Sequence, residues 1–239
     1  MTEWFQSWFN DDYLALYPHR DAAEAGQLVQ LIGRFTGWTS GWRVLDVGCG
    51  PGRHAAALEG AGVRPVGLDL SSALLRRARE VTSAPLVRAD MRRLPIRAHS
   101  VDACLSLFTS FGYFESDAEH AETLAGMAST LRPGGWFVID FLNAAQVRSH
   151  VATEPGTLQP GERGSRLRKY LSPDQRYVIK EIHLADGRQF SERVRLYHAT
   201  ELEAMLAAAG IAVEQRFGDY HGARCIDGAP RALLMGRAA

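Results

Sequence analysis

The chain has 239 residues, of which 46% are hydrophobic and 23% charged, as in a globular protein with one sizeable core. Lys plus Arg and Asp plus Glu both number 27, so no global field would attract nucleic acid or an anionic membrane. Three widely spaced cysteines form no disulfide framework or zinc pattern, and no run is long enough to span a membrane. We therefore expect one cytoplasmic, metal-free domain over residues 1–239.

The first 21 residues are rich in aromatic side chains that recur about once per helical turn, which predicts a helix with one apolar face. Most of these side chains would pack on the core. Tyr13, Tyr17 and Arg20 favour a second interpretation, in which residues 1–21 form a lid over a bound ligand. Residues 22–35 have apolar residues at helical spacing and predict a scaffold helix.

The strongest motif follows a short apolar run at residues 44–47, which is typical of a buried strand. Gly48, Gly50 and Gly52 come next at alternate positions, before a helix-forming run. A strand, a glycine turn and a helix are the parts of a nucleotide-type site, because glycine lets backbone approach a ligand and the helix start offers free N–H groups. Asp46 stands two residues before the first glycine and completes the pattern D-x-G-x-G-x-G.

This pattern resembles the first motif of the class I S-adenosylmethionine (SAM) methyltransferases. The resemblance implies that Asp46 lies near the methionyl amino group of SAM, with the glycine turn under the methionyl and ribose parts. The charges fit, since SAM carries an ammonium group and no phosphate. The spacing of Tyr17 and Arg20 is similar to the start of many small-molecule methyltransferases, where such residues reach the cofactor carboxylate. Another Rossmann-like protein remains the alternative.

Two more acidic residues follow predicted strands in the order that the resemblance implies. Asp69, beside Leu70, ends the second predicted strand, where a carboxylate accepts hydrogen bonds from both ribose hydroxyls. Nicotinamide-binding proteins place an acid similarly, so Asp69 alone does not exclude a dehydrogenase. After the third predicted strand comes Asp90, which the resemblance assigns to the adenine amino group, with Met91 packed on the ring.

Residues 100–114 predict a fourth strand and the loop beyond it, at the edge of the sheet where ligands bind. The resemblance places Leu107 and Phe108 at the methionyl end of SAM and residues 109–114 toward the acceptor. The N-P-P-Y-type motif of nucleic-acid amino methyltransferases is absent, which argues against adenine N6 chemistry.

After a predicted helix at 116–131 and a fifth strand at 136–141, the pattern changes. Residues 144–164 predict a loop, and three alternating segments follow, with the hairpin signal Asp-Gly between the last two. We expect a small antiparallel sheet inserted after the fifth strand, with residues 144–198 forming a lid subdomain over the acceptor. A helix capped by Thr200 and a terminal hairpin would complete the chain.

These features predict a single α/β domain. The resemblance implies a seven-stranded sheet in the order 3-2-1-4-5-7-6, with the last strand antiparallel. The expected reaction is SAM-dependent methyl transfer to oxygen or nitrogen of a small molecule, giving S-adenosyl-L-homocysteine (SAH). An oxygen acceptor would need a general base, whereas an amine can enter neutral. Candidate bases are Tyr113, His198 and His221.

We expect neither a nucleic-acid nor a membrane partner, and either a monomer or a homodimer. Two alternatives remain: a nicotinamide-dependent oxidoreductase, and a non-catalytic SAM-binding module.

Overall fold

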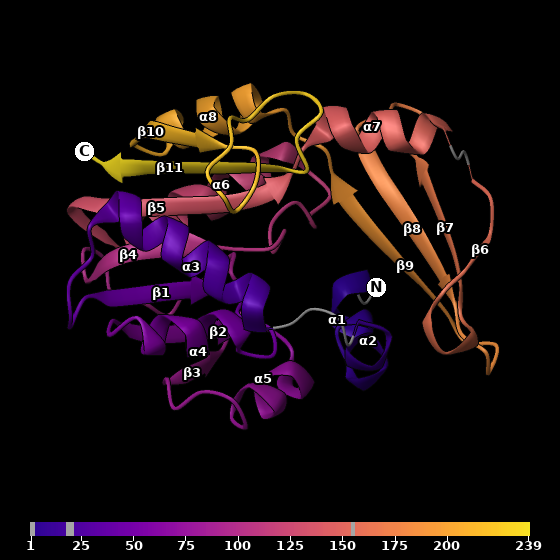
Figure 1. The fold of residues 1–239 in the computed structure, drawn as a ribbon, viewed down its shortest axis with the longest axis horizontal. Coiled ribbons are helices and arrows are strands. Elements are labelled where there is room, and N and C mark those ends of the chain that lie inside the picture. The colour runs from indigo at the N-terminus through magenta and orange to yellow at the C-terminus, as the bar shows by residue number, and fades with distance from the viewer. Residues whose placement is uncertain (1–2, 18–21, 154–155) are drawn as a thin grey trace.

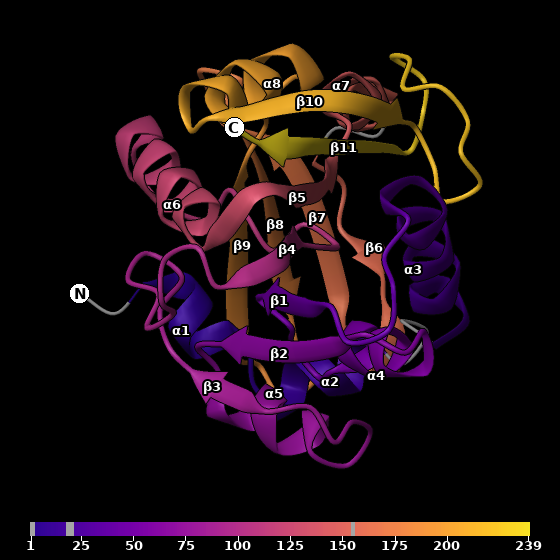
Figure 2. The same ribbon diagram turned by 90° about the vertical axis from the view of Figure 1, so that its left-hand side faces the viewer.

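The structure, a computed structural model, describes residues 3–17, 22–153 and 156–239. A seven-stranded sheet has the order β10-β11-β5-β4-β1-β2-β3, and Figure 2 shows these strands one above another. All neighbouring pairs from β3 to β5 are parallel, whereas β11 runs antiparallel to both β5 and β10. With β10 and β11 as its sixth and seventh strands, this sheet confirms the predicted fold. Its strands are β1 (Arg43–Val47), β2 (Arg64–Asp69), β3 (Leu86–Arg88), β4 (Val101–Ser106), β5 (Leu131–Leu142), β10 (Ile211–Phe217) and β11 (Arg231–Ala238).

Helices cover both faces of this sheet, because successive residues of each strand point to opposite sides and both sides are apolar. One apolar cluster joins the strands to α3 (Ala22–Thr36) and α4 (Arg53–Gly60). The other joins them to α6 (Asp117–Ser129) and α8 (Ala199–Ala208). A further helix, α5 (Ser72–Ala78), begins at Ser71, whose hydroxyl accepts the N–H of Leu74 at 3.1 Å. Every residue of β4 is buried, as expected for a strand in the middle of such a layer.

A second, four-stranded antiparallel sheet in the order β6-β7-β8-β9 follows β5 in the chain, which confirms the predicted insertion. In Figure 1 it lies apart from the main sheet, beyond the N-terminal helices. Its strands are β6 (Gln159–Pro160), β7 (Arg166–Leu171), β8 (Tyr177–His183) and β9 (Gln189–Arg195), with a 3-10 turn at Glu162–Gly164. The short β6 is one strand more than the sequence predicted.

Helix α7 (Ala144–Thr153) occupies a stretch for which the sequence predicted a loop, and that prediction was wrong. The glycines and prolines that suggested a loop begin only at residue 155. Before them, Ala144, Val147 and Val151 recur at helical spacing and are all buried.

The fifth strand also begins earlier than predicted: residues 131–135 belong to β5, where Leu131 pairs with Val101 before the register shifts. The cap of α8 also differs from the prediction. His198 rather than Thr200 precedes the helix, and its N–H donates to the Glu201 carboxylate at 2.7 Å.

The N-terminal aromatic segment forms two short helices, α1 (Trp4–Trp8) and α2 (Asp11–Leu16), between the two sheets (Figure 1). Asn10 separates them, because its side chain accepts the N–H groups of Asp12 and Tyr13 and so starts a new helix. Trp8 is fully buried and packs with Leu16 and with Ile182 of the second sheet. No helix in the described ranges has the length and apolar character needed to cross a membrane.

Candidate active site

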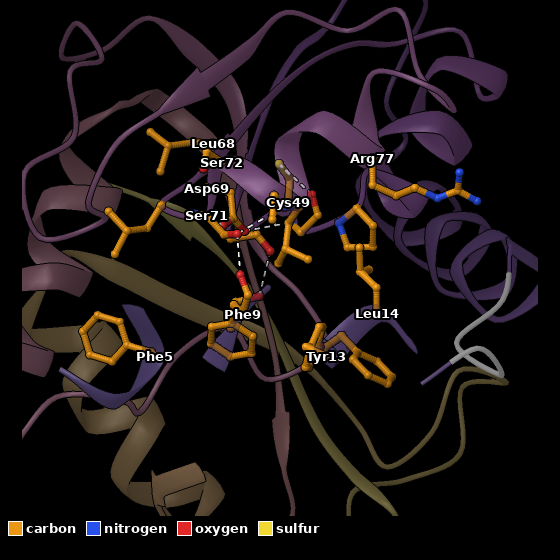
Figure 3. Close-up of a pocket in the computed structure, with 18 of the residues that line it drawn as sticks. Phe5, Phe9, Tyr13, Leu14, Cys49, Leu68, Asp69, Ser71, Ser72 and Arg77 are labelled. Carbon is orange, nitrogen blue, oxygen red and sulfur yellow. Dashed lines mark hydrogen bonds between the residues drawn. The ribbon is translucent and has the colours of Figure 1, made fainter. Parts of the chain in front are cut away.

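A cavity of about 800 Å³ lies at the carboxyl ends of β1, β2, β3 and β4, the edge at which such sheets bind ligands. The N-terminal helices face it from the other side (Figure 3). The predicted site residues in its lining are Tyr17, Gly48, Gly50, Asp69, Leu70, Asp90, Met91, Leu107, Phe108 and Tyr113. Asp46 and Gly52 lie behind this surface. Arg20 lies outside the described residues.

The glycine turn needs glycine for two different reasons. All three glycines have positive φ, at 74°, 55° and 84° for Gly48, Gly50 and Gly52. A Cβ on Gly48 would lie 2.6 Å from the Cβ of Ser110, whose hydroxyl is 3.1 Å from the Gly48 carbonyl. A Cβ on Gly52 would lie 2.9 Å from that of Ala78 in α5. Gly48 therefore lets the β4 loop approach, and Gly52 lets two helices pack.

Asp69 fixes this turn from the end of β2. Its carboxylate accepts the N–H of Gly50 and the N–H of Ser71, both at 2.8 Å (Figure 3). Burial raises the pKa of Asp69 even though these two hydrogen bonds favour the charged form. A carboxylate has about four lone-pair sites, so each oxygen retains capacity for a second donor. The ribose-binding role of Asp69 stays a prediction that this geometry permits.

Asp46 is a buried carboxylate without a complete set of partners. Its side chain is 1% exposed, and within the described ranges its Oδ2 atom has no hydrogen-bond donor. Burial and, to a lesser extent, the negative charge of Asp69 raise the pKa of Asp46 to about 7, although the Arg53 guanidinium acts to lower it. A nearby cation stabilises the ionised form of a buried carboxylate, so the chemistry of Asp46 fits the ammonium group of SAM.

The raised pKa of Asp46 predicts that SAH binding depends on pH. Because the SAH ammonium favours the ionised carboxylate, binding below about pH 7 requires Asp46 to release a proton. The affinity should therefore be level in mild alkali and fall by up to about tenfold per pH unit in acid. Isothermal titration across this range should give a flat profile for Asp46→Asn, and identical profiles for both proteins would contradict the assignment.

The same shift sets a stability profile without ligand. Since the folded protein holds this proton more tightly than the unfolded chain, the free energy of unfolding should fall as pH rises between about 4 and 7. Denaturant titration of the wild-type protein over this pH range should show the decrease, and Asp46→Asn should lack it.

Asp90 is held by Arg92, which connects the turn after β3 to Glu3, just before α1. The Arg92 guanidinium donates to Asp90 at 2.6 Å and to Glu3 at 2.7 and 2.8 Å. Although partial burial acts to raise it, the hydrogen bonds from Arg92 keep the pKa of Asp90 below its ordinary value. The Arg92 side chain is 25% exposed and lies in an ion-paired network with three carboxylates.

Aromatic side chains from α1 and from the β4 loop cover the opposite side of the cavity. Phe9 lies 5.6 Å from Tyr113, and Phe5 lies 6.0 Å from Phe114, between ring centroids. The Ser71 hydroxyl donates to the Phe9 carbonyl at 2.5 Å, which joins this cover to the turn after β2 (Figure 3). The Tyr113 hydroxyl donates its proton to the Thr109 carbonyl. The Tyr113 oxygen is therefore a hydrogen-bond acceptor toward the cavity.

Two of the candidate bases, His198 and His221, lie away from the cavity, whereas two other histidines are buried. The structure does not bring His198 or His221 to the cavity lining: His198 lies 2.8 Å from Arg148, and His221 is exposed after β10. His120 of α6 is fully buried, where its Nε2 accepts the Phe114 N–H at 3.1 Å. His54, for which no role was predicted, lines the cavity; burial and two nearby arginines lower its pKa to about 3.

Sequence reasoning also missed a buried ion pair that shapes the end of β4. The carboxylate of Asp140 is fully buried and accepts the N–H of Phe108 at 2.9 Å and the Nε–H of Arg231 at 2.8 Å. Arg231 also donates to the Thr109 hydroxyl at 3.0 Å. Phe108 and Thr109 both have positive φ, at 53° and 63°, which non-glycine residues adopt only when held. Asp140 was the one signal of this ion pair in the sequence, because a charged residue inside an apolar strand requires a partner.

Comparison with known proteins places these features in a family. The family model "Methyltransferase domain" matches residues 44–135. A dTDP-3-amino-3,4,6-trideoxy-alpha-D-glucopyranose N,N-dimethyltransferase of Streptomyces venezuelae is 30% identical over 229 residues, which cover 87% of this chain and 91% of the relative.

Solved structures that resemble this chain are also those of methyltransferases. SAM-bound CalS10, an amino pentose methyltransferase of Micromonospora echinaspora, is 25% identical with a TM-score of 0.68, covering 96% of this chain and 97% of its own. The CcbJ methyltransferase of Streptomyces caelestis is 20% identical, with a TM-score of 0.79 over 97% of this chain and 98% of its own, and supports the fold. These matches give no support to a nicotinamide-dependent oxidoreductase.

Proposed function

Because the chain belongs to the class I SAM-dependent methyltransferases, we propose that it transfers the methyl group of SAM to the amino nitrogen of a small molecule such as an amino sugar. The observation that carries this proposal is the cavity itself. It joins the glycine turn, Asp69 and Asp90 at one side to an aromatic cover at the other. The names of two similar proteins, which act on an amino sugar and an amino pentose, support the choice of nitrogen.

In this proposal the cofactor lies along the carboxyl ends of the first strands. Asp69 holds the ribose hydroxyls, Asp90 holds the adenine amino group with Met91 on the ring, and Asp46 offsets the ammonium charge. Tyr17 binds the carboxylate, a role also proposed for Arg20 from the sequence alone, and Leu107 and Phe108 line the methionyl end. SAM supplies a methyl group on a positively charged sulfur, so the acceptor needs only a lone pair aligned with the carbon–sulfur bond.

Tyr113 is proposed to orient the acceptor without removing its proton. Since its hydroxyl donates to the Thr109 carbonyl, it accepts a hydrogen bond from the acceptor N–H and aims the nitrogen lone pair at the methyl group. The nitrogen becomes positive as the new bond forms and then loses a proton to water, so no strong base is required. The aromatic cover excludes water while the methyl group moves.

Two further proposals concern the setting of the reaction. Residues 1–21 and 144–198 act as a lid segment and a lid subdomain over the acceptor. The zero net charge supports a protein without nucleic-acid or membrane partners, and three free thiols support the reducing cytoplasm. We propose a monomer or a homodimer.

A methyl-transfer assay with matched acceptors tests the proposal. By mass spectrometry, amino sugars should gain the mass of one CH2 unit for each methyl group transferred. Sugars with hydroxyl in place of the amine should show no gain in mass. Tyr113→Phe should reduce turnover by about 2- to 13-fold, the value of one neutral hydrogen bond, with an unchanged pH profile and SAH affinity. A loss of a hundredfold or more with an altered pH profile would instead make Tyr113 a general base.

A further inference from the structure

A buried histidine holds the loop that carries Tyr113. His120 of α6 is fully buried, and its ring centroid lies 5.3 Å from that of Phe114. The Nε2 atom of His120 accepts the backbone N–H of Phe114 at 3.1 Å. Tyr113 and Phe114 both line the large cavity. The histidine therefore fixes the backbone N–H that directly follows Tyr113 in the chain.

The positions of the protons in this contact follow from a chain of three side chains. The carboxylate of Asp117 can only accept, so the Tyr197 hydroxyl, at 2.8 Å, donates to it. The Nδ1 atom of His120 lies 3.0 Å from the same hydroxyl and is therefore the donor in that contact. Its Nε2 atom then keeps a lone pair for Phe114. Burial lowers the pKa of His120 to about 4, although the charge of Asp117 acts to raise it, so the ring is neutral near pH 7.

This chain of side chains reaches the second sheet. Tyr197 follows β9, and Arg195 is the last residue of that strand. The Arg195 side chain, which is 7% exposed, donates through Nε to Asp117 at 3.1 Å. The backbone N–H of Arg195 donates to the carbonyl of Gly112 at 2.8 Å. Backbone groups on both sides of Tyr113 are thus bonded to the end of β9, one directly and one through the histidine.

Packing alone does not require a histidine at this position. Aromatic rings surround His120, with centroid distances of 5.1 Å to Phe111, 5.3 Å to Phe114 and 5.6 Å to Tyr197. An apolar side chain could fill such a place without the cost of burying a polar group. It could not accept the N–H of Phe114, which would then be a buried donor without a partner. The histidine thus adds a directional bond to the loop.

We infer that His120 is a positioning residue, which through the Phe114 N–H fixes the direction from which the Tyr113 hydroxyl meets the acceptor amine, and that Tyr197 orients His120. This inference rests on the proposed function, because it concerns how the same site holds its acceptor. The competing explanation is that His120 only stabilises the fold. In that case its contribution to turnover does not depend on the Tyr113 hydroxyl.

A double-mutant cycle on the methylation of an amino sugar separates these explanations. Because His120 acts through the Tyr113 hydroxyl, His120→Leu should cost no more turnover than Tyr113→Phe, about 2- to 13-fold, with unchanged SAH affinity. In the Tyr113→Phe background the same substitution should cost less than about twofold. His120→Gln should restore most of the turnover, because its amide oxygen can accept the Phe114 N–H.

Amide hydrogen exchange at Phe114 provides a measurement that does not depend on activity. This N–H should exchange faster in His120→Leu than in the wild-type protein and stay protected in His120→Gln. Thr123→Val is the matched control. Thr123 lies one turn further along α6, is 1% exposed, and donates its hydroxyl to the Glu119 carbonyl at 2.7 Å. Its loss should lower the free energy of unfolding and leave both turnover and the exchange at Phe114 unchanged.

Tyr197→Phe takes the place of His120→Leu if the latter does not fold, since it keeps the ring and removes only the hydroxyl that orients His120. Its effect on turnover should likewise disappear in the Tyr113→Phe background. Equal fold losses in both backgrounds, or unchanged exchange at Phe114, would overturn the inference and leave His120 as part of the fold. That result with normal methylation by the wild-type protein leaves the proposed function standing, whereas a wild-type protein that methylates no amino sugar overturns both proposals.

Discussion

Replacing Asp69 with Ala should raise the dissociation constant of SAH by roughly 30-fold or more. Two charge-assisted hydrogen bonds to ribose hydroxyls are worth on the order of 2–4 kcal/mol when their contributions do not fully add. The structure adds a second reason for a large effect. The same carboxylate accepts the N–H groups of Gly50 and Ser71, so its loss also frees the turn that supports the cofactor.

Isothermal titration measures this effect, and Asp102→Ala is a suitable control. Asp102 is another buried carboxylate that accepts a backbone N–H, that of Arg43 at 2.6 Å, but it lies at the opposite end of the sheet. Its loss should lower the free energy of unfolding without changing SAH affinity. A change below threefold for Asp69→Ala, with native circular dichroism, would show that Asp69 does not hold the cofactor.

Deleting residues 1–17 should abolish turnover and weaken SAH binding while the main sheet stays folded. Neither apolar cluster of that sheet contains a residue of α1 or α2, and Trp8 and Leu16 of these helices form a separate cluster with Ile182 of the second sheet. The deletion removes Phe5 and Phe9 from the cavity lining and Glu3 from Arg92. An open cavity would expose the reacting atoms to water and lose the surface that positions the acceptor.

Amide hydrogen exchange shows whether this segment moves as a lid. Helices of 5 and 6 residues are marginal by themselves, so residues 4–17 should exchange fast in the free protein and slowly with SAH. Residues 44–47 of the central strand provide the internal reference. If the N-terminal segment is already protected to the same degree without ligand, it is part of the core and the lid proposal is wrong.

The sheet was predictable because its signals are local and consistent. An apolar strand followed by glycines, and two acids after later strands, each depend on a few neighbouring residues. Topology then brings Asp69 and Asp90 to one edge, since the carboxyl ends of parallel strands meet there. Asn10 shows the limit of such reading, because a capping side chain divided one predicted helix into two.

Features that depend on distant residues could not be read in this way. Asp140 finds its partner Arg231 from the last strand, and Arg92 finds Glu3 from before the first helix. Sequence spacing carries no information about such pairs, because they form only after the chain has folded. The same holds for Lys169 and Lys180, which lie opposite each other in β7 and β8. Alternation in the sequence predicts these strands, but only their register decides which side chains meet.

Isothermal titration of the wild-type protein with SAH and with NADH shows whether the large cavity binds SAM. We expect SAH to bind at micromolar affinity or better, with no heat from NADH. Clear binding of NADH with no heat from SAH would show that the cavity is not a SAM site.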